Sequence, residues 1–262
     1  MKKIIVITGG TSGIGKALKE KFEQDDNICY ALSIENNANV SNFFECDVTN
    51  EERVKQVLKE IYEKHNQIDI LINSAGYGLF GATEMLSTDS IKKQVDVNFM
   101  GTVITCKNAI KYMKQGGKII NISSACALFP LPYRNIYCAS KSAVASFTEG
   151  LKMELKPLQI EVTHLCPGDI KTPFIQNRVK DFTTNERYAD RIKKASEYVE
   201  AKNDNRMTTM YAVSKMYKII NKKKLKPMYI IGNKYKLLNF AMRFFPKSLY
   251  LKIVEKHFGG HK

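Results

Sequence analysis

The chain begins with a strand-like run that leads directly into a glycine-rich turn, KIIVITGGTSGIG (residues 3–15). The β-branched apolar residues of its first half predict a buried strand over 3–8. A helical pattern over 14–25 follows the glycines, with Leu18 and Phe22 on one face. A turn placed between a strand and a helix lets backbone N–H groups approach a pyrophosphate, and the helix N-terminus adds a partial positive charge. The stretch therefore favours dinucleotide binding over a glycine turn that holds no ligand.

Apolar runs rich in Ile and Val alternate with longer segments of helical spacing. The expected strands cover residues 3–8, 28–33, 43–46, 69–73, 117–122, 160–165 and 228–232. The expected helices cover residues 14–25, 50–65, 88–115, 136–156 and 208–222. Strands that are apolar throughout and separated by helices are typical of a parallel sheet covered on both faces. The sequence therefore predicts an α/β fold: a doubly wound, mostly parallel, seven-stranded sheet in a single Rossmann-type domain over 1–262.

Composition excludes several classes of protein. The 262 residues are 44% hydrophobic, which is enough for a large core and too many for a disordered chain. No run approaches the roughly 20 apolar residues of a membrane-spanning helix, and no signal-peptide cleavage site follows the first apolar run. We therefore expect a cytoplasmic protein. Six cysteines without a C-x-x-C pair and four scattered histidines predict reduced structural thiols and no metal site.

The positive charge is concentrated at one end of the sequence. Residues 201–262 carry 15 Lys and Arg against 2 Asp and Glu, and the remaining residues are nearly neutral. This distribution indicates a near-neutral domain with a basic end and not a uniformly basic nucleic-acid binder. The end lacks a recognisable nucleic-acid motif, so we expect no nucleic-acid partner.

Tyr137 and Lys141 have the spacing of neighbours on one helix face. This spacing alone is weak, because Tyr211 and Lys215 share it and are interpreted as a solvated pair. Tyr137 differs in having Ser124 upstream, at the carboxyl end of an expected strand. The carboxyl ends of strands are where α/β sheets bind ligands.

With these motifs the chain resembles the short-chain dehydrogenase/reductase family. The resemblance covers residues 3–172 continuously and 228–232 more loosely. It rests on Thr8-Gly9-x-x-x-Gly13-x-Gly15, Asp47-Val48, Asn73-Ser74-Ala75-Gly76, Asn98, Ser124, Tyr137-x-x-x-Lys141 and Pro167-Gly168 followed by Thr172. Each motif is weak alone, whereas the ordered set is specific. Ser74 is a mild departure, because the family usually has Asn there.

The resemblance implies an oxidoreductase that interconverts a secondary alcohol and a ketone. Tyr137 would be the general acid/base, and the Lys141 ammonium would favour its phenolate. Ser124 would donate a hydrogen bond to the substrate oxygen. Asn98 would help a water to relay protons to Lys141, although the alternative, a polar residue that interrupts a helix, carries more weight for Asn98 than for the other three residues.

The implied cofactor is NAD or NADP. The residues expected to contact it are Thr8, Gly9, Thr11, Ser12, Gly13, Ile14, Gly15, Ser33, Asp47, Val48, Asn73, Ala75, Gly76, Tyr137, Lys141, Pro167, Gly168 and Thr172. NAD users in the family often place Asp at position 33, and NADP users often place a basic residue at position 34 or 12; this chain has neither. Glu35 could accept the ribose hydroxyls or repel a 2′-phosphate, which favours NAD, or it could simply face solvent.

Two segments fall outside the common core. Residues 173–207 are interpreted as a lid over the substrate, the alternative being an ordinary surface insertion. Residues 235–262 are basic and apolar, and Pro246 would split any helix there. This end could pack on the domain or on a partner, wall a lipophilic pocket, or touch an anionic membrane surface. The last two readings favour a lipophilic substrate such as a hydroxysteroid or a 3-oxoacyl compound.

Two further expectations concern partners and function. The resemblance implies a homo-dimer or homo-tetramer. A non-catalytic dinucleotide-binding redox sensor is the alternative function, against which the presence of all four catalytic residue types argues.

Overall fold

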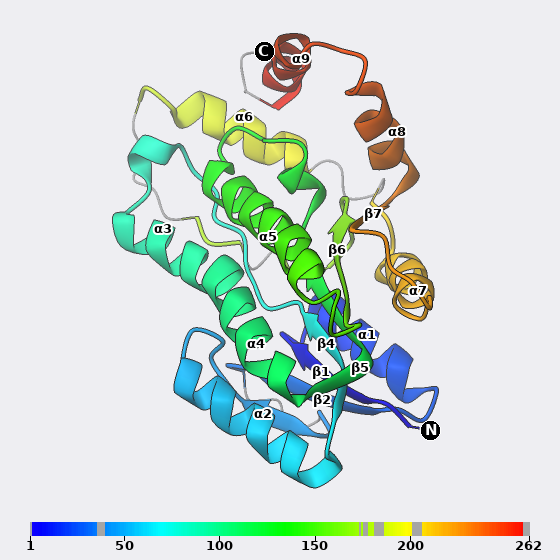
Figure 1. Cartoon of the computed structure of the whole chain (residues 1–262). Helices are drawn as coiled ribbons and strands as arrows, with labels where there is room; N and C mark the ends of the chain where they lie inside the picture. Colours follow the sequence, from blue (N-terminus) through cyan, green and yellow to red (C-terminus); the bar gives the residue numbers. More distant parts are fainter. Residues whose placement is uncertain are drawn as a thin grey trace.

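A seven-stranded parallel sheet forms the centre of the protein (Figure 1). The computed structural model describes residues 2–35, 40–172, 174, 178–180, 186–200 and 206–258. The strands are β1 (Ile4–Thr8), β2 (Ile28–Ser33), β3 (Phe43–Glu45), β4 (Ile68–Asn73), β5 (Met113–Ile122), β6 (Glu161–Pro167) and β7 (Met228–Ile231). Their order across the sheet is β3-β2-β1-β4-β5-β6-β7, and every neighbouring pair is parallel. The predicted single Rossmann-type domain is therefore confirmed.

Helices cover both faces of this sheet. The helices within the described ranges are α1 (Gly13–Glu23), α2 (Glu51–His65), α3 (Thr88–Val95), α4 (Gly101–Ala109), α5 (Asn135–Glu154), α6 (Ala189–Glu200), α7 (Thr209–Ile220), α8 (Asn233–Ala241) and α9 (Lys247–Phe258). The apolar sides of α2, α4 and α5 pack on one face, and those of α1 and α7 pack on the other. None of the helices in the described ranges combines the length and the apolar character that crossing a bilayer requires.

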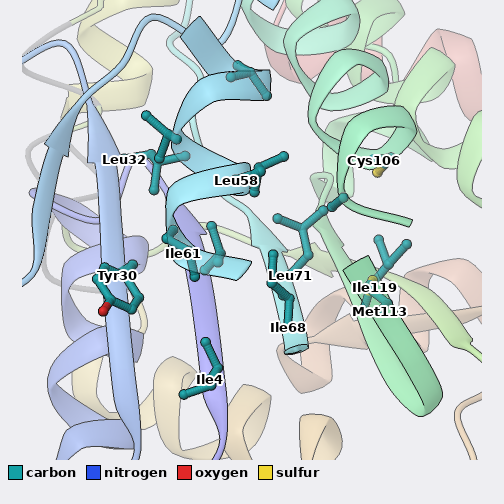
Figure 2. Close-up of a cluster of buried hydrophobic side chains, with 14 of the residues drawn as sticks. Ile4, Tyr30, Leu32, Leu58, Ile61, Ile68, Leu71, Cys106, Met113 and Ile119 are labelled. Carbon is teal, nitrogen blue, oxygen red and sulfur yellow. The ribbon is translucent and has the colours of Figure 1, made fainter. Parts of the chain in front are cut away.

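The two hydrophobic cores follow from the alternation of side chains along each strand. In β1, Val6 points into the core beneath α2, α4 and α5, whereas Ile5 and Ile7 point into the core beneath α1 and α7. Figure 2 shows the first core, in which Leu58 and Ile61 of α2 meet the sheet. Each fully buried Leu or Ile contributes about 1.5–3 kcal/mol, so the sheet holds its strand ends in fixed positions.

The expected continuous helix over 88–115 is wrong. The segment is divided into α3, a π-helical turn over Asp96–Met100, α4 and a short 3₁₀ turn, and β5 already begins at Met113. At the start of α4, a Cβ on Gly101 would lie 2.5 Å from Cγ2 of Val48, so glycine is needed for this close approach. The π turn places Asn98 inside the protein, and such turns are frequent at functional sites.

The last part of the chain folds back over the loop that follows β5. Pro246 separates α8 from α9, as the sequence predicted. Tyr250 and Val254 of α9 are buried against Ala125 and Phe129. Figure 1 shows both helices at the same end of the molecule as α6, beyond the carboxyl ends of the strands. The described part of the basic apolar end, residues 235–258, therefore packs on the domain beside the loop that carries Ser124.

Candidate active site

The turn after β1 depends on direct contact between backbones. Gly9 has φ +65°, and its N–H donates to the carbonyl of Leu32 at 2.7 Å. A Cβ on Gly9 would lie 2.9 Å from the backbone of Ala75, and one on Gly15 would lie 2.3 Å from the carbonyl oxygen of Gly9. Larger residues at these two positions would therefore push the turn away from α1 and from the loop after β4.

The first turn of α1 has backbone N–H groups that an α-helix leaves without an intrahelical partner. Ser12 occupies the N-cap without a side-chain capping bond, and the first turn holds no acidic residue. A Cβ on Gly13 would meet no atom within 4 Å, so space lies open in front of these N–H groups. Helix N-termini of this kind bind phosphate groups. The glycine turn and the start of α1, residues 9–15, therefore form a cradle that fits the pyrophosphate of a dinucleotide.

Thr8 connects the glycine turn after β1 to the loop after β4. Its hydroxyl accepts hydrogen bonds from the backbone N–H groups of Ser74 and Ala75, both at 3.1 Å. Because β1 and β4 are adjacent in the sheet, this bond closes the point where the strand order reverses. Ligands of doubly wound proteins bind in the crevice at that point.

The predicted adenosine end is built from short polar contacts. The hydroxyl of Thr11 donates to that of Ser33 at 2.9 Å, and the N–H of Glu35 donates to the same serine oxygen at 3.3 Å. Asp47 accepts from both the N–H and the hydroxyl of Thr49. Asn50, and not Asp47, caps α2, so helix capping does not explain Asp47.

The structure brings Ser124, Tyr137 and Lys141 together. Ser124 follows the end of β5, and its hydroxyl, which accepts from the Cys126 N–H at 3.1 Å, lies near enough to the phenol of Tyr137 on α5 to affect its pKa. The ammonium of Lys141 donates to the carbonyl of Ile122 at 2.9 Å. The neighbouring Ser123 hydroxyl donates to the Lys141 carbonyl at 2.8 Å. These bonds fix α5 against β5, so the strand end and the helix set the Ser124–Tyr137 contact.

Burial shifts the pKa of both titratable groups toward their neutral forms. Desolvation raises the pKa of Tyr137 well above its ordinary value, and the nearby Ser124 hydroxyl opposes that shift only in part. Desolvation lowers the pKa of Lys141 to about 8. At neutral pH, Tyr137 therefore holds its proton and the Lys141 side chain is still a cation.

Asn98 is fully buried between α5 and the loop after β4. Its amide donates to the carbonyl of Tyr77 at 3.0 Å and to the hydroxyl of Ser140 at 3.2 Å, and its oxygen accepts from the Tyr77 N–H at 3.0 Å. A Cβ on Gly76 would lie 2.9 Å from that oxygen and 3.5 Å from the Lys141 ammonium. Asn98 therefore shapes the surroundings of Lys141, and its part in a water relay stays a prediction.

Asn73 occupies a buried polar network beneath the cradle. Its amide donates to the side-chain oxygen of Asn121 at 2.8 Å, and its oxygen accepts from the hydroxyl of Thr105 at 2.6 Å. Asn121 in turn donates to Thr148 at 2.9 Å. The side chain of Asn73 thus joins β4, β5, α4 and α5, and a direct contact with the cofactor stays a prediction.

The turn after β6 closes the site on its far side. Gly168 donates to the carbonyl of Ile231 at 3.0 Å, and the ring of Tyr235 fills the space where a Cβ would stand, with ring atoms 2.0 Å from that position. The Tyr235 hydroxyl donates to Asp169 at 2.6 Å. The predicted residue Gly168 therefore lies against a side chain from α8, and the contacts of Pro167 and Thr172 with the cofactor stay predictions.

Several residues around Tyr137 escaped the sequence analysis. They are Cys126, Arg134, Phe174, Arg178 and Tyr250. They come from the loop after Ser124, from the segment expected to form a lid, and from α9, and no local pattern marks them. Much of the expected lid, residues 173, 175–177, 181–185 and 201–205, lies outside the described residues.

Comparisons with known proteins agree with this geometry. The family model described as short chain dehydrogenase matches residues 3–182. A relative named 3-ketodihydrosphingosine reductase, from Bacteroides thetaiotaomicron, is 36% identical over 209 residues, which are 78% of each chain. A 3beta-hydroxysteroid dehydrogenase from Mediterraneibacter gnavus is 29% identical over 70% of this chain and 71% of its own.

Solved structures agree as well. The structure of ElxO with NADP bound superposes with a TM-score of 0.74 at 27% identity, covering 90% of this chain and all of that one. NAD(P) is the typical cofactor of the matched family. The chain therefore belongs to the short-chain dehydrogenase family, whose members are oxidoreductases acting on CH–OH and carbonyl groups.

Proposed function

We propose that this protein interconverts a ketone and a secondary alcohol on a lipophilic substrate, with Ser124, Tyr137 and Lys141 as its catalytic residues. The observation that carries the proposal is the closeness of the Ser124 hydroxyl to the Tyr137 phenol, with Lys141 one helical turn after Tyr137 and its ammonium bound to the carbonyl of Ile122. Two hydroxyl groups that lie this close together can both contact a single substrate oxygen.

Each of these side chains has a task that follows from its surroundings. Tyr137 holds its proton at neutral pH and donates it to the carbonyl oxygen during reduction. Ser124 donates a hydrogen bond to the same oxygen and stabilises the charge that develops there. The Lys141 cation favours the phenolate that remains on Tyr137. The nicotinamide, when bound, supplies or accepts the hydride.

The surroundings of Tyr137 support a lipophilic substrate. The ring of Phe174 lies 5.6 Å from that of Tyr137, and Phe129 and Tyr250 pack 6.0 Å apart in the cluster beside Ser124. The relatives named above include a 3-ketodihydrosphingosine reductase and a hydroxysteroid dehydrogenase, both named for a lipid class. Apolar walls with a few polar groups are typical of such pockets.

The first test replaces the phenol. We expect Tyr137→Phe to lower kcat with a ketone substrate at least about 1,000-fold, because both the proton donor and one hydrogen bond to the substrate oxygen are lost. Cofactor binding, measured by titrating protein fluorescence, should stay within about twofold, since the glycine turn is untouched.

Tyr211→Phe is the matched control, because Tyr211 also precedes a lysine by four positions and its half-exposed ring lies 5.2 Å from the Lys215 ammonium. This variant should keep wild-type turnover. Near wild-type turnover of Tyr137→Phe would end the catalytic assignment, and intact cofactor binding without turnover of any ketone would favour a redox sensor.

Glu35 supports NAD as the preferred cofactor. Its side chain is exposed beside Ser33, the strand end expected to meet the adenosine ribose. We expect Glu35→Gln to lower KM for NADP by about tenfold with little change for NAD, because a carboxylate repels a 2′-phosphate. Steady-state kinetics with both cofactors measure this, and a wild-type protein that uses only NADP would contradict the choice of NAD.

A further inference from the structure

Two arginines beside Tyr137 point to a charged group on the substrate. We propose that the substrate carries an anionic oxygen group, a phosphate or a carboxylate, which Arg134 and Arg178 bind next to the carbonyl that is reduced. The inference rests on the proposed function and adds a substrate class to it. Three independent observations support it: the position of Arg178, the buried Nη2 of Arg134 and the buried hydroxyl of Tyr250.

Arg178 is placed by backbone pairing and not by a carboxylate. The N–H of Val179 donates to the carbonyl of Gly78 at 2.9 Å, and the N–H of Phe80 donates to the carbonyl of Val179 at 3.0 Å. The guanidinium then lies 5.8 Å from the centre of the Phe80 ring. A Cβ on Gly78 would be 3.4 Å from Nε of Arg178, so the arginine side chain lies directly over this glycine.

Arg134 carries a buried donor without a partner. It immediately precedes α5, and its backbone carbonyl accepts from the N–H of Cys138 at 2.9 Å, so it lies one turn before Tyr137. Its Nη2 is buried and finds no hydrogen-bond partner among the described residues. An unpaired guanidinium N–H in a protein interior costs free energy and is rare in native structures. An oxygen atom of a ligand would accept the missing hydrogen bond from Nη2 of Arg134.

Tyr250 supplies a second donor of this kind from another wall. Its hydroxyl is also buried and has no partner within the described part of the chain. Its electrostatic neighbours are Cys126 and Cys138, which are also neighbours of Tyr137. Two unpartnered donors, one before α5 and one on α9, therefore surround the same thiols beside the catalytic pair.

The charge around Tyr137 favours an anion over a cation. Arg134 and Arg178 act on each other and on Tyr137. Burial, with the neighbouring Arg134, lowers the pKa of Arg178 to about 10, which leaves it charged at neutral pH. Neither arginine forms an ion pair with any carboxylate in the described ranges. Charge-assisted hydrogen bonds to phosphate or carboxylate are the strongest use of such a pair.

The test uses probes that separate anion binding from catalysis. Octyl phosphate, octanoate and octanol are titrated by calorimetry into protein saturated with cofactor, so that the pyrophosphate cradle is already filled. We expect octyl phosphate or octanoate to bind at least about tenfold more tightly than octanol. Arg134→Gln and Arg178→Gln should each weaken the anion about 10- to 100-fold and leave octanol unchanged. Arg178→Lys should recover part of the loss.

Arg243→Gln is the matched control, since Arg243 is exposed between α8 and α9, and it should bind every probe as the wild type does. Thermal denaturation of each variant shows that it is folded. Equal binding of the charged and neutral probes, or equal losses in the control, would overturn the proposal.

Turnover distinguishes this inference from the function on which it rests. We expect 1-phosphooxy-2-decanone to have kcat/KM at least about tenfold above that of 1-hydroxy-2-decanone, with the difference abolished in Arg178→Gln. A preference for the neutral ketone, or for the cationic 1-trimethylammonio-2-decanone, would overturn the anionic substrate while the ketone reductase stands. Binding of octyl phosphate without turnover of any ketone would instead contradict the proposed function.

Discussion

At the residue scale, the candidate site keeps an amine where water does not reach it. Lys141 is 5% exposed, and its ammonium donates a hydrogen bond to the carbonyl of Ile122. Because burial lowers its pKa to about 8, the charged form is disfavoured in the folded protein relative to the unfolded chain. Lys141 therefore destabilises the fold at neutral pH while it holds a positive charge near Tyr137.

Because the buried charge costs stability but serves catalysis, we expect Lys141→Met to be inactive and more stable than the wild type at pH 7. A lysine pKa of about 8 instead of its ordinary value corresponds to about 3 kcal/mol. Loss of the hydrogen bond to Ile122 lowers stability by about 1 kcal/mol. We therefore expect the free energy of unfolding to rise by about 2 kcal/mol. Urea denaturation of the cofactor-free protein measures the free energy of unfolding.

The pH dependence gives the sign of the effect. Above pH 8 the folded protein binds fewer protons at Lys141 than the unfolded chain, so wild-type stability rises toward pH 10. The advantage of Lys141→Met should therefore be largest at and below pH 7 and shrink as the pH increases. An advantage that stays constant between pH 7 and pH 10 would show that burial of the charge is not its cause.

At the element scale, the strand ends set the site and the glycines let them meet. The turn after β1 contacts α1, β2 and the loop after β4 through backbone atoms. The cradle therefore has little tolerance for added side-chain atoms, and its shape depends on those contacts more than on any polar side chain.

Replacing Gly15 tests this dependence. A Cβ at this position would lie 2.3 Å from the carbonyl oxygen of Gly9, a distance that forces the turn to move. We expect Gly15→Ala to raise the Kd for the cofactor at least about tenfold and to lower the melting temperature. Calorimetric titration and thermal denaturation measure the two effects.

Gly150 offers the matched control, because a Cβ there would meet no atom within 4 Å in the middle of α5. Gly150→Ala should stabilise the protein by about 0.5–1 kcal/mol and leave cofactor affinity unchanged. If both alanine variants bound the cofactor equally well, the backbone contact at Gly15 would not be what shapes the cradle.

The sequence revealed the elements that follow a local period and missed those that depend on packing. The strand runs and the glycine turn agree with the structure within a few residues, because apolar runs and glycines leave local signals. The π turn around Asn98 was missed, since one extra residue in a turn hardly changes an apolar period. α6 was missed in a polar segment with few apolar positions. Arg178 and Tyr250 reach the site through tertiary contacts, which leave no pattern in the sequence of the expected lid or of α9.

At the scale of the whole molecule, α8 and α9 leave a second apolar surface uncovered. Tyr250 and Val254 face the domain, whereas large apolar side chains on the other sides of these helices are exposed. The exposed side chains are Leu237, Leu238, Phe240, Phe244, Phe245, Leu249, Leu251 and Ile253. Lysines and Arg243 lie between them. Apolar residues interleaved with basic ones fit an anionic bilayer surface.

We therefore expect the protein to bind vesicles that contain phosphatidylglycerol. Phe240, Phe244 and Phe245 are 56–70% exposed, and changing all three to Ser should lower the fraction that sediments with such vesicles at least about fivefold. Vesicles of phosphatidylcholine alone, or high salt, should also weaken binding, because the lysines then contribute less.

The matched control changes Met153 and Leu158 to Ser, since both are similarly exposed but lie in and after α5. This variant should sediment as the wild type does. Sedimentation that the phenylalanine changes leave untouched would contradict membrane contact, and a shift from dimer to monomer in the phenylalanine variant would show that a second copy covers the surface.

The ring of Tyr235 standing where a Gly168 side chain would be makes these two distant positions a single evolutionary unit. A larger residue at position 168 would overlap this ring, so we expect it to occur together with a smaller residue at position 235. We expect the change to a smaller residue at position 235 to precede the change to a larger residue at position 168. Reconstructed ancestral sequences that carry only one of the two changes should carry the one at 235.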